Sequence, residues 1–130
     1  MSVCLDSWAI LAWLDGEDPA FSRVEELVPA RPMASWINLV EVYNRLERDQ
    51  GRLAADATLR ELRATISLDL PGTARMIETA RLKARAAIAL ADCFAVTTAA
   101  AHGLPLLTGD PEIIDLPDRP CEVEDLRPLS

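Results

Sequence analysis

The sequence predicts one α/β domain in which helices cover both faces of a central parallel sheet. Short apolar segments alternate with longer helical segments, an order typical of such a sheet. The stretches between the expected strands are long enough for the crossover connections that parallel strands need. A chain of 130 residues is also the size that a single hydrophobic core serves. We therefore expect residues 1–130 to form one three-layer α/β/α domain without repeats or a linker.

The first part of the chain is expected to contain two strands and two helices. Asp6 follows a short apolar segment and has a side chain that caps helix N-termini well. Gly16 and Pro19 end the first helix, because both residues are unfavourable in a helix interior. The expected elements are a strand over 2–5, helices over 7–14 and 20–28, and a strand over 33–35.

The middle of the chain is expected to contain three helices and one strand. Gly51 ends the first of these helices as a C-terminal cap. Residues 66–70 alternate apolar and polar side chains and precede Pro71 and Gly72, a pattern that indicates a strand and a turn. Thr73 is the expected N-cap of the last helix. The expected elements are helices over 37–50 and 54–65, a strand over 66–70 and a helix over 73–86.

The last part of the chain is expected to contain an Ala-rich helix, two strands and a short helix. Gly103 ends the Ala-rich helix, and the turn-forming run TGDP at 108–111 ends the strand that follows. The expected elements are a helix over 89–102, a strand over 104–107, a short helix over 112–114 and a strand near 121–123.

The net charge and the cysteines exclude several classes of protein. A charge of −8 argues against a protein that coats nucleic acid by bulk charge, because such binding needs Lys and Arg to neutralise phosphates. It argues equally against an anionic membrane surface as partner, and no apolar run approaches the roughly 20 residues that cross a bilayer. The three cysteines, Cys4, Cys93 and Cys121, show no paired spacing, and the N-terminus does not resemble a secretory signal. We therefore expect packed thiols in a cytoplasmic protein.

Basic residues gather in the middle of the chain. From Arg45 to Arg85, nine basic residues accompany six acidic ones, which gives this segment a charge of +3 and the rest of the chain −11. The segment could bind an anion that the whole molecule repels. It could equally form the solvated faces of ordinary helices.

Four acidic residues differ from the others in their context. Asp6 and Asp110 each directly follow an expected strand, and ligands of open parallel sheets bind at the carboxyl ends of the strands. Each could also be a simple helix cap. Glu41 lies on a partly apolar stripe of its helix, although Arg45, four residues on, is an alternative surface partner.

Asp92 is the most informative of the four acids. It is the only Asp, Glu, Lys or Arg in the 24 positions between Arg85 and Asp110, and its neighbours are those of a buried helix. Asp has poor helix propensity, and burying a charge is costly unless it is paired or binds a metal. A buried Asp that is satisfied by hydrogen bonds is the alternative.

Together the four acids predict a divalent metal site. Two carboxylates at strand ends and two on helices can meet above a parallel sheet, where their like charges raise one another's pKa unless a cation lies between them. Carboxylate oxygens suit Mg²⁺ or Mn²⁺ rather than zinc, and His102 is the only histidine. In the absence of a Ser–His or Cys–His pair, phosphodiester hydrolysis by metal-activated water is the chemistry that fits best.

Four segments, in order along the chain, carry a resemblance to a known family. They are VCLDS at 3–7, SWINLVEV at 35–42, ALADCFA at 89–95 and LLTGDPE at 106–112. These segments resemble the PIN-domain ribonucleases, and in particular the VapC toxins of bacterial type II toxin–antitoxin pairs.

The resemblance implies a compact α/β/α PIN domain and an endoribonuclease that depends on Mg²⁺ or Mn²⁺. It implies that four acids surround the ion: Asp6, Glu41, Asp92 and Asp110. Among them, Asp6 and Asp92 match the steadiest direct ligands of the family. Ser7 and Thr108 match positions that hydrogen-bond these acids. Asn38 stands near the glutamate where the family commonly has a small hydroxyl residue, and we expect it to support the site.

The resemblance also implies three partners: an RNA substrate, a cognate antitoxin that enters the active-site groove, and a second copy of the chain in a homodimer. No basic residue matches an RNA-binding position of the family. Charge alone gives the candidates Arg45, Arg48, Arg81, Lys83 and Arg85. The indoles of Trp8, Trp13 and Trp36 could stack on bases, but packing is the favoured interpretation.

Three alternatives to a toxin follow from the same residues. A housekeeping RNA-processing nuclease of the same family would have the same site. A non-catalytic relative that only binds partners would not need all four acids. Haloacid-dehalogenase-like phosphatases share a late acidic motif, here Gly109-Asp110 and Asp115, but they need a second Asp where this chain has Trp8.

Overall fold

The computed structural model describes residues 2–129 of the chain. It contains a five-stranded sheet with the strand order β3-β2-β1-β4-β5, and all neighbouring strands are parallel. The strands are β1 (Cys4–Leu5), β2 (Met33–Ser35), β3 (Ser67–Asp69), β4 (Leu106–Thr108) and β5 (Val123–Asp125). This arrangement confirms the central parallel sheet that the alternation of segments predicts.

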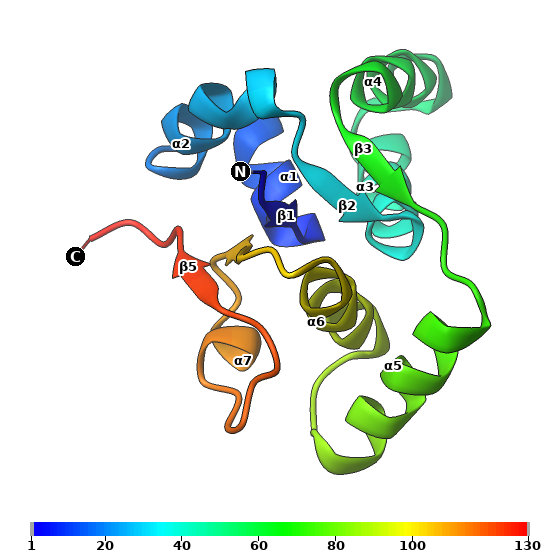
Figure 1. Ribbon diagram of the computed structural model, residues 1–130. Coiled ribbons are helices and arrows are strands. Elements are labelled where there is room, and N and C mark those ends of the chain that lie inside the picture. The colour runs from blue at the N-terminus through cyan, green and yellow to red at the C-terminus, as the bar shows by residue number, and fades with distance from the viewer. Residues whose placement is uncertain (1, 130) are drawn as a thin grey trace.

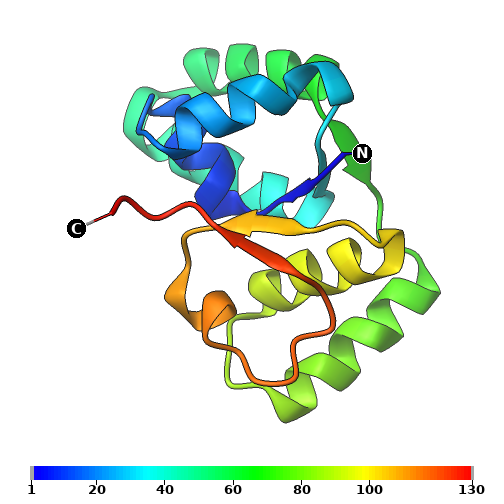
Figure 2. The same ribbon diagram turned by 60° about the vertical axis from the view of Figure 1, so that its left-hand side comes forward.

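Helices cover both faces of this sheet, as Figures 1 and 2 show. One layer contains α1 (Ser7–Leu14), α2 (Ala20–Leu27), a short 3₁₀ turn (Val28–Ala30), α3 (Trp36–Gln50) and α4 (Arg52–Thr65). The other layer contains α5 (Thr73–Arg85), α6 (Leu90–His102) and α7 (Pro111–Ile114). The predicted three-layer α/β/α architecture is therefore confirmed. None of the helices in residues 2–129 is long and apolar enough to cross a membrane.

Alternating side chains of the central strands build two separate hydrophobic cores. Leu5 of β1 and Leu107 of β4 are neighbours in the ladder and pack with the helices α1 to α4. Cys4 and Leu106 are likewise neighbours and pack with α5, α6 and α7. Because successive residues of a strand point to opposite faces, both faces of the two central strands are buried. This rigid centre carries the segments that follow β1 and β4.

The boundaries of several elements differ from the predicted ones by a few residues. The last strand, which the sequence predicts near 121–123, runs from Val123 to Asp125, where it lies at the edge of the sheet. Polar residues such as Glu124 are tolerated there, since an edge strand exposes part of its surface to solvent. The expected cap Thr73 is instead the first residue of α5, and Gly72 precedes it as the N-cap.

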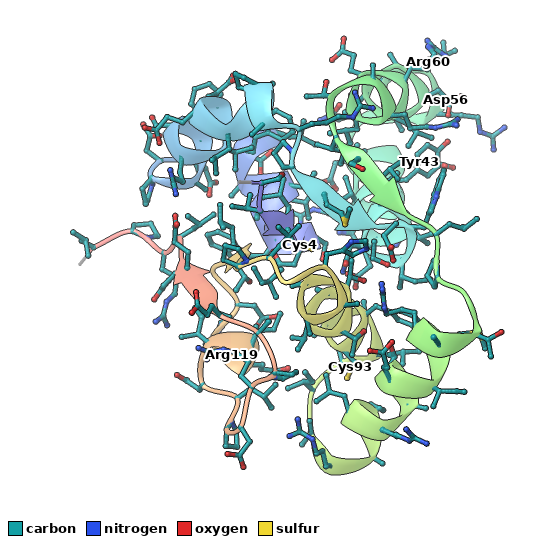
Figure 3. The ribbon with its side chains drawn as sticks, viewed as in Figure 1. Cys4, Tyr43, Asp56, Arg60, Cys93 and Arg119 are labelled. Atoms are coloured by element: carbon teal, nitrogen blue, oxygen red, sulfur yellow. The ribbon has the colours of Figure 1, made fainter. Side chains whose placement is uncertain are left out.

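The cysteines are free thiols, as their spacing predicts. Cys4 on β1 and Cys93 on α6 are fully buried, and Figure 3 shows both in the interior of the molecule. Cys121 is half-buried.

Side-chain bonds tie the outer helices to their neighbours. Tyr43 of α3 donates a hydrogen bond of 2.6 Å to Asp56 of α4, and Figure 3 labels both residues. Arg23 of α2 donates two hydrogen bonds, of 2.8 and 3.0 Å, to Glu124 of β5. The second contact joins the α1–α2 end of one helical layer to the edge of the sheet.

Candidate metal centre

Asp6 lies where β1 passes into α1, at the carboxyl end of the sheet. It is the N-cap of α1, and its Oδ1 accepts a hydrogen bond of 2.8 Å from the Ala9 amide. Its Oδ2 accepts a short hydrogen bond from the Thr108 hydroxyl of β4. The side chain is only 1% exposed. The cap interpretation is thus correct for one oxygen, while the other oxygen faces the neighbouring strand.

Glu41 lies on the exposed side of α3, not on a partly apolar stripe as its position suggested. The buried stripe of α3 consists of Asn38, Leu39, Val42 and Leu46. The partner of Glu41 is Ser7, whose hydroxyl donates a 2.6 Å hydrogen bond to Oε1. Arg45, the alternative partner, instead forms an ion pair with Asp49 at 2.8 Å. Glu41 is therefore bonded to Ser7, the first residue of α1, which directly follows Asp6.

Asp92 lies in the first turn of α6 and is 8% exposed, in agreement with its apolar neighbours. Asn38 of α3 fastens this turn, because its Nδ2 donates a 3.1 Å hydrogen bond to the carbonyl of Ala91. The expected support from Asn38 thus acts on the backbone beside Asp92 and not on a carboxylate. The Oδ1 atom of Asn38 is buried and has no hydrogen-bond partner among residues 2–129.

Asp110 follows β4 and caps α7, and its Oδ1 accepts a 2.9 Å hydrogen bond from the Glu112 amide. Its own amide donates to the Thr108 hydroxyl at 3.0 Å, so Thr108 bonds both Asp6 and Asp110. Carboxylate oxygens of Asp92, Asp110 and Glu112 lie within 4.8 Å of one another. We refer to Asp6, Glu41, Asp92, Asp110 and Glu112 as the acidic site.

Glu112 is the member of the acidic site that sequence reasoning missed. The sequence pattern at this position indicates only the beginning of a short helix. A signal was present, since Asp110 and Glu112 are separated by a single residue, Pro111, that starts the helix. In such a cap the backbone amide of Glu112 donates a hydrogen bond to the Asp110 carboxylate. This bond keeps Glu112 and Asp110 close to each other.

Burial and neighbouring carboxylates both raise the pKa values of acids in this site. Burial raises the pKa of Asp6 to about 7, hydrogen bonds from Thr108 and Ala9 oppose this rise, and the charges of Asp110 and Glu41 add to it. Burial also raises the pKa of Asp92, and the neighbouring Asp110 is the next largest cause. Two buried acids that hold their protons near neutral pH indicate a site that lacks a compensating positive charge.

The donors of the acidic site fit a hard divalent cation. They are carboxylate oxygens, the ligands that Mg²⁺ and Mn²⁺ prefer. Each ion pair within residues 2–129 that involves Lys, Arg or His uses an acid outside the site. A bound cation would relieve the repulsion that raises the two pKa values. The residues present are therefore suited to Mg²⁺ or Mn²⁺.

The five basic candidates for RNA contact are all exposed and belong to two regions of the surface. Arg45 and Arg48 lie on the second half of α3, and both are within ion-pair distance of Asp49. Arg81, Lys83 and Arg85 lie on α5 in the opposite helical layer. The three tryptophans all pack against the core of the α1–α4 layer, which confirms the packing interpretation.

Replacement of Thr108 tests how much the acidic site depends on this hydroxyl. Thr108→Val keeps the shape of the side chain but removes the hydrogen bond to the buried Asp6. We expect the free energy of unfolding to fall by about 2–3 kcal/mol, since a buried carboxylate loses a partner. Thr108→Ser keeps the hydroxyl and is expected to lose only about 1 kcal/mol, for the missing methyl group. Urea unfolding at pH 8 measures both values, and equal losses in the two variants would contradict the assignment.

Comparisons with known proteins agree with this fold. A family model described as PIN domain matches residues 3–118. VapBC2 from Rickettsia felis is similar in structure, with a TM-score of 0.79 and 16% identity over 98% of this chain and 100% of that chain. VapBC from Salmonella typhimurium gives 0.78 and 19% over 96% and 98%. VapC20 from Mycobacterium tuberculosis, a toxin that cleaves the sarcin–ricin loop, gives 0.70 and 18% over 85% and 91%. A search of the curated proteins finds no significant match.

Proposed function

Because the chain belongs to the PIN domain family, we propose that it is an Mg²⁺- or Mn²⁺-dependent endoribonuclease and the toxin of a type II toxin–antitoxin pair. The observation that carries the proposal is the acidic site itself. Carboxylates from the ends of β1 and β4 and from α3, α6 and α7 interact with one another without a basic partner in residues 2–129. Such a site suits a cation that meets the phosphate of a nucleic acid.

We assign two kinds of role to the side chains of the site: some would bind the ion, and others would orient its ligands or water. When bound, the ion would polarise a phosphoryl oxygen and lower the pKa of a water molecule. Asp6 and Asp92, the two buried acids, are assigned as direct ligands, and Asp110 and Glu112 complete the site from the β4–α7 side. Thr108 is assigned to orient Asp6, because its hydroxyl donates a hydrogen bond to this carboxylate without binding the ion itself. Glu41, exposed and held by Ser7, is assigned to orient water at the rim.

Cleavage of RNA that depends on a divalent cation is the direct test. The purified chain is expected to cut structured and single-stranded RNA when Mg²⁺ or Mn²⁺ is present, and to stop when EDTA is in excess. Activity should return after Mn²⁺ is added beyond the chelator. Gel analysis of end-labelled RNA measures the products. Cleavage that continues at full rate in EDTA would contradict the proposal.

The affinity for Mn²⁺ is expected to rise with pH up to about 7 and then to level off. Protons on Asp6 and Asp92 compete with the ion, since the pKa of Asp6 is about 7 and that of Asp92 is also raised. Between pH 7 and pH 5.5 we expect the affinity to fall at least about 10-fold, as one or two protons must be displaced. Isothermal titration calorimetry measures this dependence, and an affinity that is flat across this range would show that neither acid is a ligand.

RNA contacts outside the acidic site are assigned to the exposed basic residues. Arg45 is the first candidate, because it lies one helical turn from Glu41 on α3. Arg48 also lies on α3, near its end. A second contact could come from α5, where the candidates are Arg81, Lys83 and Arg85. Recognition of this kind usually targets single-stranded or looped RNA, whose bases are accessible.

Protein partners are proposed from the apolar surface and from the family. The structurally similar proteins include a toxin–antitoxin complex from Klebsiella pneumoniae and VapBC-5 from Mycobacterium tuberculosis, a member of the VapBC family of toxin–antitoxin systems. In this chain, α3 and α4 enclose an apolar cleft of about 180 Å³ lined by Trp36, Leu39, Val40, Tyr43 and Leu59. Val40 is 62% exposed there. An apolar cleft that opens to solvent is a place where an apolar side chain of a partner can be buried. We propose a cognate antitoxin and a second copy of the chain as the partners.

Growth arrest on expression, relieved by the product of an adjacent small gene, would separate a toxin from a housekeeping nuclease.

A further inference from the structure

The loop between β4 and α7 touches α1 at a glycine that has no room for a side chain. Gly109 lies between Thr108 and Asp110 and is buried. A Cβ atom at Gly109 would lie far closer than van der Waals contact to Cζ2, Cη2 and Cε2 of Trp8. Real Cβ contacts are essentially never shorter than 3.0 Å. The indole ring of Trp8 therefore lies directly against the backbone of Gly109.

This contact belongs to the segments that carry two of the acids. Trp8 is in the first turn of α1, the helix that Asp6 caps, so Trp8 and Asp6 have a fixed relation through the helix backbone. Gly109 directly precedes Asp110 in the chain. The same two segments are joined a second time, by the hydrogen bond from Thr108 to Asp6.

The two contacts act on successive residues. Thr108 is held in β4 by strand pairing and by its hydrogen bond to Asp6. Gly109 is the first residue beyond the strand, and Trp8 packs on its backbone. We infer that Trp8 is a positioning residue that sets the orientation of Asp110 toward Asp6 by packing on Gly109. This inference rests on the proposed function for the role of the acids, but not for the contact itself.

The glycine is needed for space and not for its backbone conformation. The glycines of this chain that adopt a positive φ are Gly16, Gly51 and Gly103, and Gly109 is not among them. Gly109→Ala is therefore expected to disturb the site only through its collision with Trp8. If the indole is removed, the methyl group has room, so the two substitutions should not act independently.

A double-mutant cycle on the full chain tests the inference by Mn²⁺ affinity. For Gly109→Ala and for Trp8→Ala, we expect a loss of affinity of about 10–100-fold, the size typical of residues that orient metal ligands. Trp8→Phe, which keeps a smaller ring, should lose less and serves if Trp8→Ala does not fold. The Trp8→Ala/Gly109→Ala double variant should bind Mn²⁺ about as tightly as Trp8→Ala alone, because the added methyl group then meets no indole. Additive losses would overturn the inference.

Trp13→Ala is the matched control. Trp13 is on the same helix and packs against the same core, but it is not among the atoms nearest to Gly109. We expect a lower melting temperature and an Mn²⁺ affinity within about twofold of the unsubstituted chain, since core packing is lost but the loop is not. A loss of affinity in Trp13→Ala as large as that in Trp8→Ala would show a merely structural effect.

A metal-free measurement separates this inference from the proposed function. The Asp110 amide donates to Thr108, so its hydrogen exchange reports the order of the loop. Exchange should be at least about 10-fold faster in Trp8→Ala than in Trp13→Ala. If the unsubstituted chain binds no Mn²⁺, the proposed function fails, and the exchange rates still decide about Trp8. If Trp8→Ala raises KM for RNA but leaves both Mn²⁺ affinity and exchange unchanged, Trp8 contacts RNA and the inference is wrong.

Discussion

Asp92→Asn should reduce RNA cleavage at least about 100-fold while the chain stays folded. A loss of this size exceeds what substitution of partners outside the ligand shell costs, which is about 10–100-fold. Asp92 is 8% exposed, lies near Asp110 and Glu112, and has no basic partner among residues 2–129. The amide of Asn keeps the volume of the carboxylate but removes its negative charge and one acceptor oxygen. Single-turnover cleavage of end-labelled RNA, with circular dichroism of the same samples, measures both results.

Glu61→Gln is a suitable control for this substitution, because Glu61 is an exposed acid on α4. It should leave the cleavage rate within about twofold, as surface substitutions away from special features have small effects. A fully active Asp92→Asn variant would refute the assignment of the acidic site.

In the metal-free protein, Asp92→Asn should raise stability at pH 8 by roughly 2–4 kcal/mol, because the pKa of the Asp92 carboxyl is raised to about 7 in the folded chain. The pKa of Asp92 is raised in the folded chain, first by burial and then by Asp110. The folded state therefore holds a proton that the unfolded chain releases near pH 4, so stability falls as pH rises from 4 toward 7. Above about pH 7 the penalty is complete. At pH 5 the unfolded chain has already released most of this proton while the folded chain keeps it, so only part of the penalty applies and the gain from Asp92→Asn should be less than half of that at pH 8.

Urea unfolding in EDTA at pH 5 and pH 8 measures this difference. Saturating Mn²⁺ should reverse the order of the two proteins at pH 8, because a ligand stabilises only the folded chain that binds it. Glu61→Gln should show neither the pH-dependent gain nor the reversal. A loss of stability in Asp92→Asn at pH 8 without metal would indicate that the carboxylate is satisfied by the protein.

The strand–helix alternation and the isolated acid at position 92 were sufficient to predict the fold and the burial of that acid. Asp6 and Asp110 could be placed at one edge of the sheet, because parallel strands end on the same side. The prediction for Glu41 was wrong in its surroundings. On α3, Val40 is exposed and Val42 is buried, so the apolar stripe is rotated away from Glu41. Helical periodicity alone cannot choose between two such stripes when apolar residues are adjacent.

Other features depend on contacts between distant segments and could not be obtained from local patterns. Ser7 meets Glu41 across 34 positions, and Thr108 meets Asp6 across 102. Residue types at these positions gave only a resemblance to a family. The contact between Trp8 and Gly109 left no periodic signal at all, since it joins one side chain to a bare backbone.

The order of the strands also determines when the acidic site is complete during synthesis. β4 pairs with β1 in the centre of the sheet although it comes late in the chain, after residue 105. A nascent chain that ends before β4 already contains Asp6, Glu41 and Asp92 but lacks Thr108 and Asp110. Chains fold as they are made, N-terminal parts first. Most of the chain is thus synthesised before all five acids of the acidic site are present.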